Sequence, residues 1–121
     1  MKFITLSSIV LLLALAACAV PANAQNPPIK IVMSPRQTVP LWDIEKNINE
    51  KCPNVKIVLD SRKSDYMLEA LGWSGSYHFT LFRKGGEVVF GTNTVMLSNA
   101  IKDVCKYMNA HGPVTAQAAE N

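Results

Sequence analysis

Hydrophobic and polar residues recur along this chain with two different periods, which predict two kinds of element. Alternation with a period of two predicts strands, whereas apolar residues three or four positions apart predict helices. The first strand is predicted at residues 29–33 (IKIVM). A helix is predicted from about residue 41 to residue 52, with Thr38 as its N-cap and Pro53 as its stop. Its apolar face comprises Leu41, Ile44, Ile48 and Cys52.

Four more strands and a second helix follow. Residues 55–60 (VKIVLD) and 66–71 predict two strands, with Gly72 ending the second. Residues 77–83 and 87–91 flank a Gly-containing loop and predict a β-hairpin. The last helix is expected to be capped within residues 92–94 and to end near Gly112. Its apolar face comprises Leu97, Ile101, Val104, Cys105 and Met108.

The element order β-α-β-β-β-β-α predicts an α+β fold. Two amphipathic helices need an apolar surface to cover, and a mixed sheet of about five strands supplies it. We therefore expect a two-layer sandwich with both helices packed on one sheet face. The first two strands are joined through a helix and are expected to be parallel. Residues 29–33 are a candidate free edge for another strand.

Residues 1–24 have the anatomy of a secretory signal, with Lys2 ahead of a short apolar run. That run is shorter than the roughly 20 residues that span a bilayer. Two processing alternatives stay open. Cleavage before Gln25 gives a soluble periplasmic or secreted chain, whereas use of the lipobox Leu15–Cys18 leaves a lipidated Cys18 in the envelope. Residues 25–112 form the predicted domain, and residues 113–121 are predicted to be a disordered tail.

Charge and cysteine content narrow the functional classes. The net charge of +3 is too small to favour nucleic acid as a partner, and membrane contact is expected only through a lipid at Cys18. Processing accounts for Cys18, so Cys52 and Cys105 remain as an even pair in a compartment that permits disulfides. Both lie near a helix C-terminus on the apolar face, and we predict a bond between them. Two buried free thiols are the alternative.

Candidate chemistry is sparse. The stretch GWSGS, residues 72–76, resembles a nucleophile elbow, but Ser76 replaces the second glycine and a strand follows. A small secreted hydrolase that uses Ser74 or Ser76 with His78, and with Asp65 available, is therefore the alternative hypothesis. His78 and His111 lack metal-ligand spacing. We expect no catalytic residue, metal or cofactor.

Binding has more candidates. Trp73 lies in a Gly- and Ser-rich stretch, where it either contacts a partner or folds over the sheet edge. Trp42 is expected at the edge of the core. The basic pairs 62–63 and 83–84 would contact an acidic surface if they cluster, and otherwise are solvated turns.

Four short motifs suggest relatives. They are Cys52-Pro53, SDY at residues 64–66, FRKGGEVVFGTNT at residues 82–94 and NAIKDVC at residues 99–105. Together they resemble a group of small, uncharacterised secreted bacterial proteins. More distantly, the layout is similar to the small α/β domain of TolB, curli-secretion and penicillin-binding-protein-activator lipoproteins, although Ser64 replaces an alanine and the cysteine pair is not part of that pattern. The resemblance implies an α/β fold in the cell envelope and supplies no catalytic residue. The predicted function is a non-enzymatic binding or assembly module stabilised by one disulfide.

Overall fold

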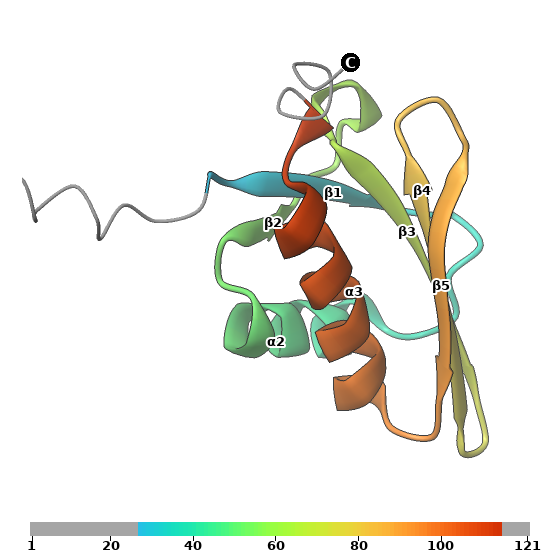
Figure 1. Ribbon diagram of the computed structural model, residues 1–121. Helices are drawn as coiled ribbons and strands as arrows, with labels where there is room; N and C mark the ends of the chain where they lie inside the picture. Colours follow the sequence, from blue (N-terminus) through green and yellow to red (C-terminus); the bar gives the residue numbers. More distant parts are fainter. Residues whose placement is uncertain (1–26, 115–121) are drawn as a thin grey trace, which may run out of the picture.

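The computed structural model describes residues 27–114 (Figure 1). Its elements are β1 (Ile29–Met33), α2 (Leu41–Lys51), β2 (Val55–Ile57), the 3-10 turn η2 (Ser61–Lys63), β3 (Tyr66–Trp73), β4 (Ser76–Arg83), β5 (Val88–Thr94) and α3 (Leu97–His111). The predicted order and the α+β class are confirmed. Neither helix of this part of the chain is long and apolar enough to cross a membrane.

The predicted signal segment, residues 1–24 with Cys18, lies outside the described residues, as does most of the predicted tail. Pro113 and Val114 are described, and the Val114 amide donates a hydrogen bond to Oδ1 of Asp65 (2.9 Å). The start of the predicted tail is therefore tied to the beginning of β3.

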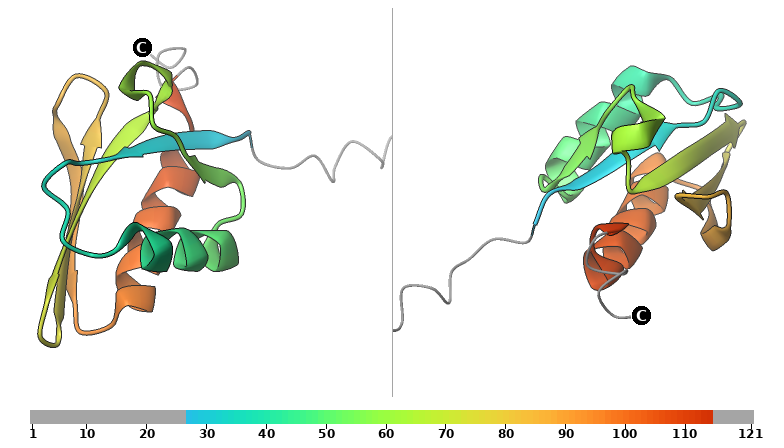
Figure 2. Two further views of the ribbon diagram at one scale, coloured as in Figure 1. Left: turned by 180° about the vertical axis from the view of Figure 1, so that it is seen from behind. Right: turned by 90° about the horizontal axis from the view of Figure 1, so that it is seen from above.

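The five strands form one sheet in the order β2-β1-β3-β4-β5. β1 runs parallel to both β2 and β3, and the remaining pairs are antiparallel. The expectation of a free edge at β1 is therefore wrong, because β2 and β3 occupy both of its sides. The edges among the described residues are β2 and β5. β1 crosses β3 at a steep angle, so the sheet is strongly twisted (Figures 1 and 2).

One face of the sheet forms the core with the two helices. Alternate strand residues point into it and are almost fully buried, as are the inner residues of α2 and α3: Ile29, Ile31, Tyr66, Leu68, Phe79, Leu81, Ile44, Ile48, Ile101, Val104 and Met108. The intervening strand residues face the other side, which neither helix covers. This uncovered side is called the open face below.

The predicted disulfide between Cys52 and Cys105 is confirmed. Cys52 directly follows α2, and Cys105 lies within α3 on its buried face. Both residues are almost fully buried, at 1% and 4% exposure. The bond fastens the two helices to each other on the covered face of the sheet.

Gly72 does not end β3, which continues through Trp73. The loop before α2 crosses over this glycine, whose amide donates to Thr38 Oγ1 (2.8 Å). A Cβ atom on Gly72 would lie 2.9 Å from Cγ2 of Val39. Glycine is therefore required here for close approach and not for a turn. The chain reverses at the following residues, where Gly75 has a φ of 70°.

Both predicted helix caps are wrong. Thr38 bonds to Gly72 instead of the helix, and α2 begins after Pro40. Residues 92–94 belong to β5, and α3 begins after Met96. The Thr38 side chain is engaged by β3, and the backbone of residues 92–94 pairs with β4. In both places a tertiary contact overrides the local preference for a cap.

Replacing both Cys52 and Cys105 by alanine is expected to lower the free energy of unfolding by about 2–4 kcal/mol. The bond joins residues separated by 53 positions, so the unfolded chain regains loop entropy when it is removed. Urea unfolding followed by circular dichroism measures the change. Reductant should bring the wild type to the same midpoint and leave the double variant unaffected. Equal midpoints for wild type and variant without reductant would contradict the expectation.

Candidate functional site

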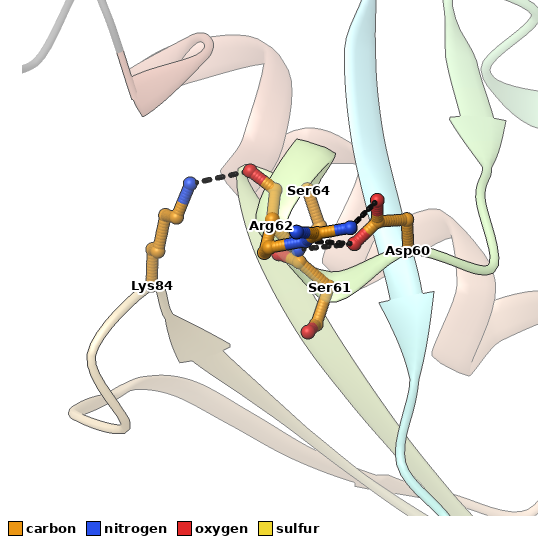
Figure 3. A network of polar contacts seen from close by, with 5 residues as sticks. All are labelled: Asp60, Ser61, Arg62, Ser64 and Lys84. Carbon is orange, nitrogen blue, oxygen red and sulfur yellow. Dashed lines mark hydrogen bonds and ion pairs between the residues drawn. The ribbon is translucent and has the colours of Figure 1, made fainter.

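The two basic turns of the sequence come together at one end of the sheet. η2 lies beside the β4–β5 loop at the upper end of the molecule in Figure 1. Nζ of Lys84 donates a 2.7 Å hydrogen bond to the backbone carbonyl of Arg62 (Figure 3). This contact joins segments 22 residues apart in the sequence. The two basic turns therefore lie together, a question that the sequence left open.

Between the two turns lies a cleft of about 290 Å³, called the basic cleft. Its floor is apolar and is formed by Val32, Met67 and Phe82, which come from β1, β3 and β4 and are partly buried. Its rim carries the cationic side chains Arg62, Arg83 and Lys84. The other lining residues are Ser61, Ser64, Gly85 and Gly86, so no carboxylate of the described chain lines the cleft.

Asp60 holds Arg62 in place from outside the cleft. Oδ1 of Asp60 accepts from the backbone amide of Arg62 (2.9 Å) and from its Nε (3.2 Å). Oδ2 accepts from Nη2 of the same guanidinium at 3.2 Å, which completes a two-pronged contact (Figure 3). The side-chain hydrogen bonds from Arg62, and then its backbone amide, lower the pKa of Asp60 below its usual value.

The cations of the rim differ in how they are engaged. Nη1 of Arg83 lies 3.8 Å from a carboxylate oxygen of Glu87, a long contact between exposed groups that stabilises weakly. Lys84 donates to a neutral carbonyl, which positions the ammonium without cancelling its charge. Ser64 Oγ donates to the carbonyl of Ser61 (2.7 Å) and fixes the turn between them. The arrangement can hold an anionic group at the rim and an apolar group on the floor.

The sequence identified the basic turns but missed the floor. Val32, Met67 and Phe82 occupy strand positions whose neighbours in sequence point into the core, so their side chains lie on the open face. The available signal was that these strands carry apolar residues in both phases of the alternation. That pattern indicates apolar surface on the face that the helices leave uncovered.

The candidate hydrolytic residues lie on the open face or in a turn. Ser76 and His78 are two positions apart in β4 and therefore share a face. Ser76 Oγ donates to Oδ1 of Asn93 (3.2 Å), and His78 is exposed. Ser74 lies in the β3–β4 turn.

Asp65 does not join these residues. It precedes β3, whereas Ser74 follows the other end of that strand. A strand of eight residues spans about 26 Å at the usual rise per residue. The Asp65 carboxylate instead accepts from the backbone amides of Lys30 (2.9 Å) and Val114. A Ser-His-Asp group that includes Asp65 is therefore not assembled.

Trp73 is 61% exposed at the end of β3, so much of its side chain is accessible. It lines a second cleft of about 220 Å³ with residues that include Pro40, Asp43 and Leu97. This cleft lies at the opposite end of β3 from the basic cleft. Trp42, expected at the edge of the core, is 74% exposed.

The two histidines lie on different elements, His78 in β4 and His111 in α3. His111 is in the last turn of α3, and its Nδ1 lies 2.9 Å from the carbonyl of Tyr107. Its ring stacks on Tyr107 at 3.9 Å. Within residues 27–114, no three His, Cys, Asp or Glu side chains gather in a way that could hold a metal ion.

No protein-family model, curated protein or solved structure matches the chain. The resemblance inferred from the four motifs therefore stays a prediction.

The Asp60 carboxyl should titrate below the usual range of an aspartate, because ionised Asp60 is favoured by Arg62. A lowered folded-state pKa contributes stability above the unfolded-state pKa, and this contribution is lost as pH falls through the folded-state value. Asp60 is therefore ionised at neutral pH. An NMR titration of the side-chain carboxyl measures its midpoint.

Arg62→Gln should move that midpoint part of the way up, since the backbone amide of residue 62 can still donate. Lys63→Gln, which removes a neighbouring charge but none of the bonds to Asp60, is the matched control. An equal rise in the two variants would show that overall charge, and not the two-pronged contact, sets the Asp60 pKa.

Proposed function

We propose that this protein is an exported, non-enzymatic binding or assembly module of the bacterial cell envelope. Its ligand or partner presents a carboxylate or phosphate attached to an apolar body. The observation that carries the proposal is the basic cleft, in which three cationic side chains surround an apolar floor. An anion at the rim would meet Arg62, Arg83 and Lys84, and an apolar group beside it would cover Val32, Met67 and Phe82.

The form of the cleft suits recognition. The guanidinium of Arg62 is oriented by Asp60, and Lys84 is anchored to the carbonyl of Arg62, so little side-chain freedom is lost when an anion binds. Specificity comes from combining the two features. A charged group alone would leave the apolar floor exposed to water, whereas an apolar group alone would desolvate the cations without replacing their hydration.

The envelope setting is supported by the disulfide, because such bonds persist in oxidising compartments. It agrees with the secretory pattern of residues 1–24 and with the resemblance to small secreted proteins. The alternative, a small secreted hydrolase that uses Ser74 or Ser76 with His78, has less support because the Ser76 hydroxyl is engaged by Asn93. Trp73, at the other end of β3, is an additional surface for a protein partner.

Hexanoate and hexyl phosphate are expected to bind the basic cleft, whereas the neutral isostere hexanamide is not. Two-dimensional NMR of the protein should show concentration-dependent shifts at residues 62–64, 67 and 82–86 with the anions. Raising the salt concentration should weaken the binding, because the cations are exposed to solvent. Comparing the affinity of hexanoate with that of hexyl phosphate shows whether the cleft prefers a carboxylate or a phosphate.

Lys84→Met should weaken hexanoate binding by about two- to fivefold, as expected for one exposed charge pair. Lys102→Met removes the same charge from the exposed surface of α3 and should leave binding unchanged. Shifts of equal size with hexanamide, or equal losses in the two variants, would count against the proposed function.

The intact mass of the chain recovered from the envelope of an expressing bacterium tests export and processing. We expect either a chain that begins at Gln25 or one that begins at a lipidated Cys18, since the two signals cannot both be used. Cys18→Ala should remove the lipidated form and leave cleavage before Gln25 intact. A chain that retains residues 1–24 in the cytoplasm would refute export.

A further inference from the structure

β5 is the longer of the two sheet edges in the described part of the chain. It comprises seven residues, Val88–Thr94, whereas β2 at the other edge has three. Edge strands that do not pair are usually protected by charged residues or proline. β2 carries Lys56, but β5 contains neither a charged residue nor a proline. The amides and carbonyls on the outer side of β5 are therefore unprotected against pairing with another strand.

The pairing of β5 with β4 is regular from Phe90 to Thr94, beyond the irregularity between Leu81 and Phe82. Two identical strands that pair antiparallel are related by a two-fold axis. For the core faces of the two copies to lie on the same side, each residue must pair with a residue an even number of positions away in the sequence. If the two-fold axis passes beside Thr92, all five regularly paired residues of β5 can pair with the second copy. Gly91 of one copy then lies opposite the partner's Asn93 on the open face, and Thr92 lies opposite the partner's Thr92.

The flank of α3 borders this edge. Phe90 stacks on Tyr107 at 5.3 Å, and Thr92 Oγ1 donates to Oδ2 of Asp103 at 2.7 Å. A groove of about 400 Å³ runs beside them, lined by Phe90, Asp103, Lys106, Tyr107, Ala110 and His111. A strand added to β5 would therefore have one of its faces against α3.

We propose that β5 pairs with β5 of a second copy of this chain, giving a continuous ten-stranded sheet and a two-fold symmetric dimer. The two α3 helices then lie antiparallel on the same side of the joined sheet. Asp103 and Lys106 are about one helical turn apart and both line the groove, so the antiparallel α3 helices bring opposite charges to the interface. The groove on each copy is closed by the other copy.

A second copy fits this edge better than an unrelated extended segment. The uncharged edge is self-complementary in the stated register, with Gly91 offering no side chain where the two open faces meet. The α3 flank carries one acidic and one basic residue, Asp103 and Lys106, so the same flank presented in reverse offers each of them the opposite charge. The proposal does not depend on the basic cleft.

Sedimentation equilibrium of the processed chain, with its disulfide intact, should show a reversible monomer–dimer equilibrium. The double variant G91K/N93K places lysines opposite each other twice in the stated register and should raise the dissociation constant by about tenfold or more. A Cβ at residue 91 has ordinary room, with its closest contact 3.8 Å away, so the monomer should keep its fold. Circular dichroism checks this.

S76K/H78K is the matched control, with the same two charges on the same face but one strand inside the edge. It should leave the dissociation constant within about twofold of the wild-type value. A wild type that is monomeric throughout, or a dimer that both double variants weaken equally, would overturn the proposal.

Cross-linking tests the register without relying on charge. An equimolar mixture of G91C and N93C chains should form a disulfide-linked heterodimer under mild oxidation, because residues opposite each other in antiparallel strands are close enough to bridge. A chain with K56C, on the other edge, should not cross-link. Cross-linking of K56C to the same extent, or none for the mixture, would also overturn the proposal. Hexanoate binding to the G91K/N93K monomer would show that the proposed function survives without the dimer.

Discussion

The disulfide between Cys52 and Cys105 is the constraint on which the two-layer arrangement depends. A domain of this size buries a small core, and here that core lies on one face of the sheet. The bond joins the end of α2 to the middle of α3, so the helices that cover the core are fastened to each other as well as to the strands. The long segment between them, which carries β2, β3, β4 and β5, folds within a closed loop.

Because both helices cover one face of the twisted sheet, only loops border the other face. Apolar side chains of β1, β3 and β4 emerge there and are only partly shielded, and the two basic turns fold toward them. The single hydrogen bond from Lys84 to the carbonyl of Arg62 brings these turns together. The same asymmetry leaves β5 as an edge that is bordered on one side by α3. Both candidate surfaces thus follow from the one-sided placement of the helices.

The candidate site was only partly accessible from sequence. Four basic residues in two turns were visible, but whether they meet depends on which loops share an end of the sheet. That follows from the parallel placement of β1 beside β3 and the antiparallel β3–β4–β5 run, which fixes η2 and the β4–β5 loop at one end. The floor residues were assigned to no role because alternation treats the second face of a strand as polar.

The sequence by itself determined the identity and order of the elements, the apolar faces of both helices except for Leu41, which is exposed, and the pairing of Cys52 with Cys105. Each of these depends on local periodicity, on turn residues or on the elimination of Cys18 as a partner. Only the tertiary structure decided that β1 is central, that Gly72 is a crossing point within a strand, that Thr38 bonds to it, and that Trp42 is exposed. The physical reason is that periodicity reports which side of an element is buried, whereas these features depend on which neighbour lies against it. Contacts between residues far apart in the chain leave no local pattern from which they can be inferred.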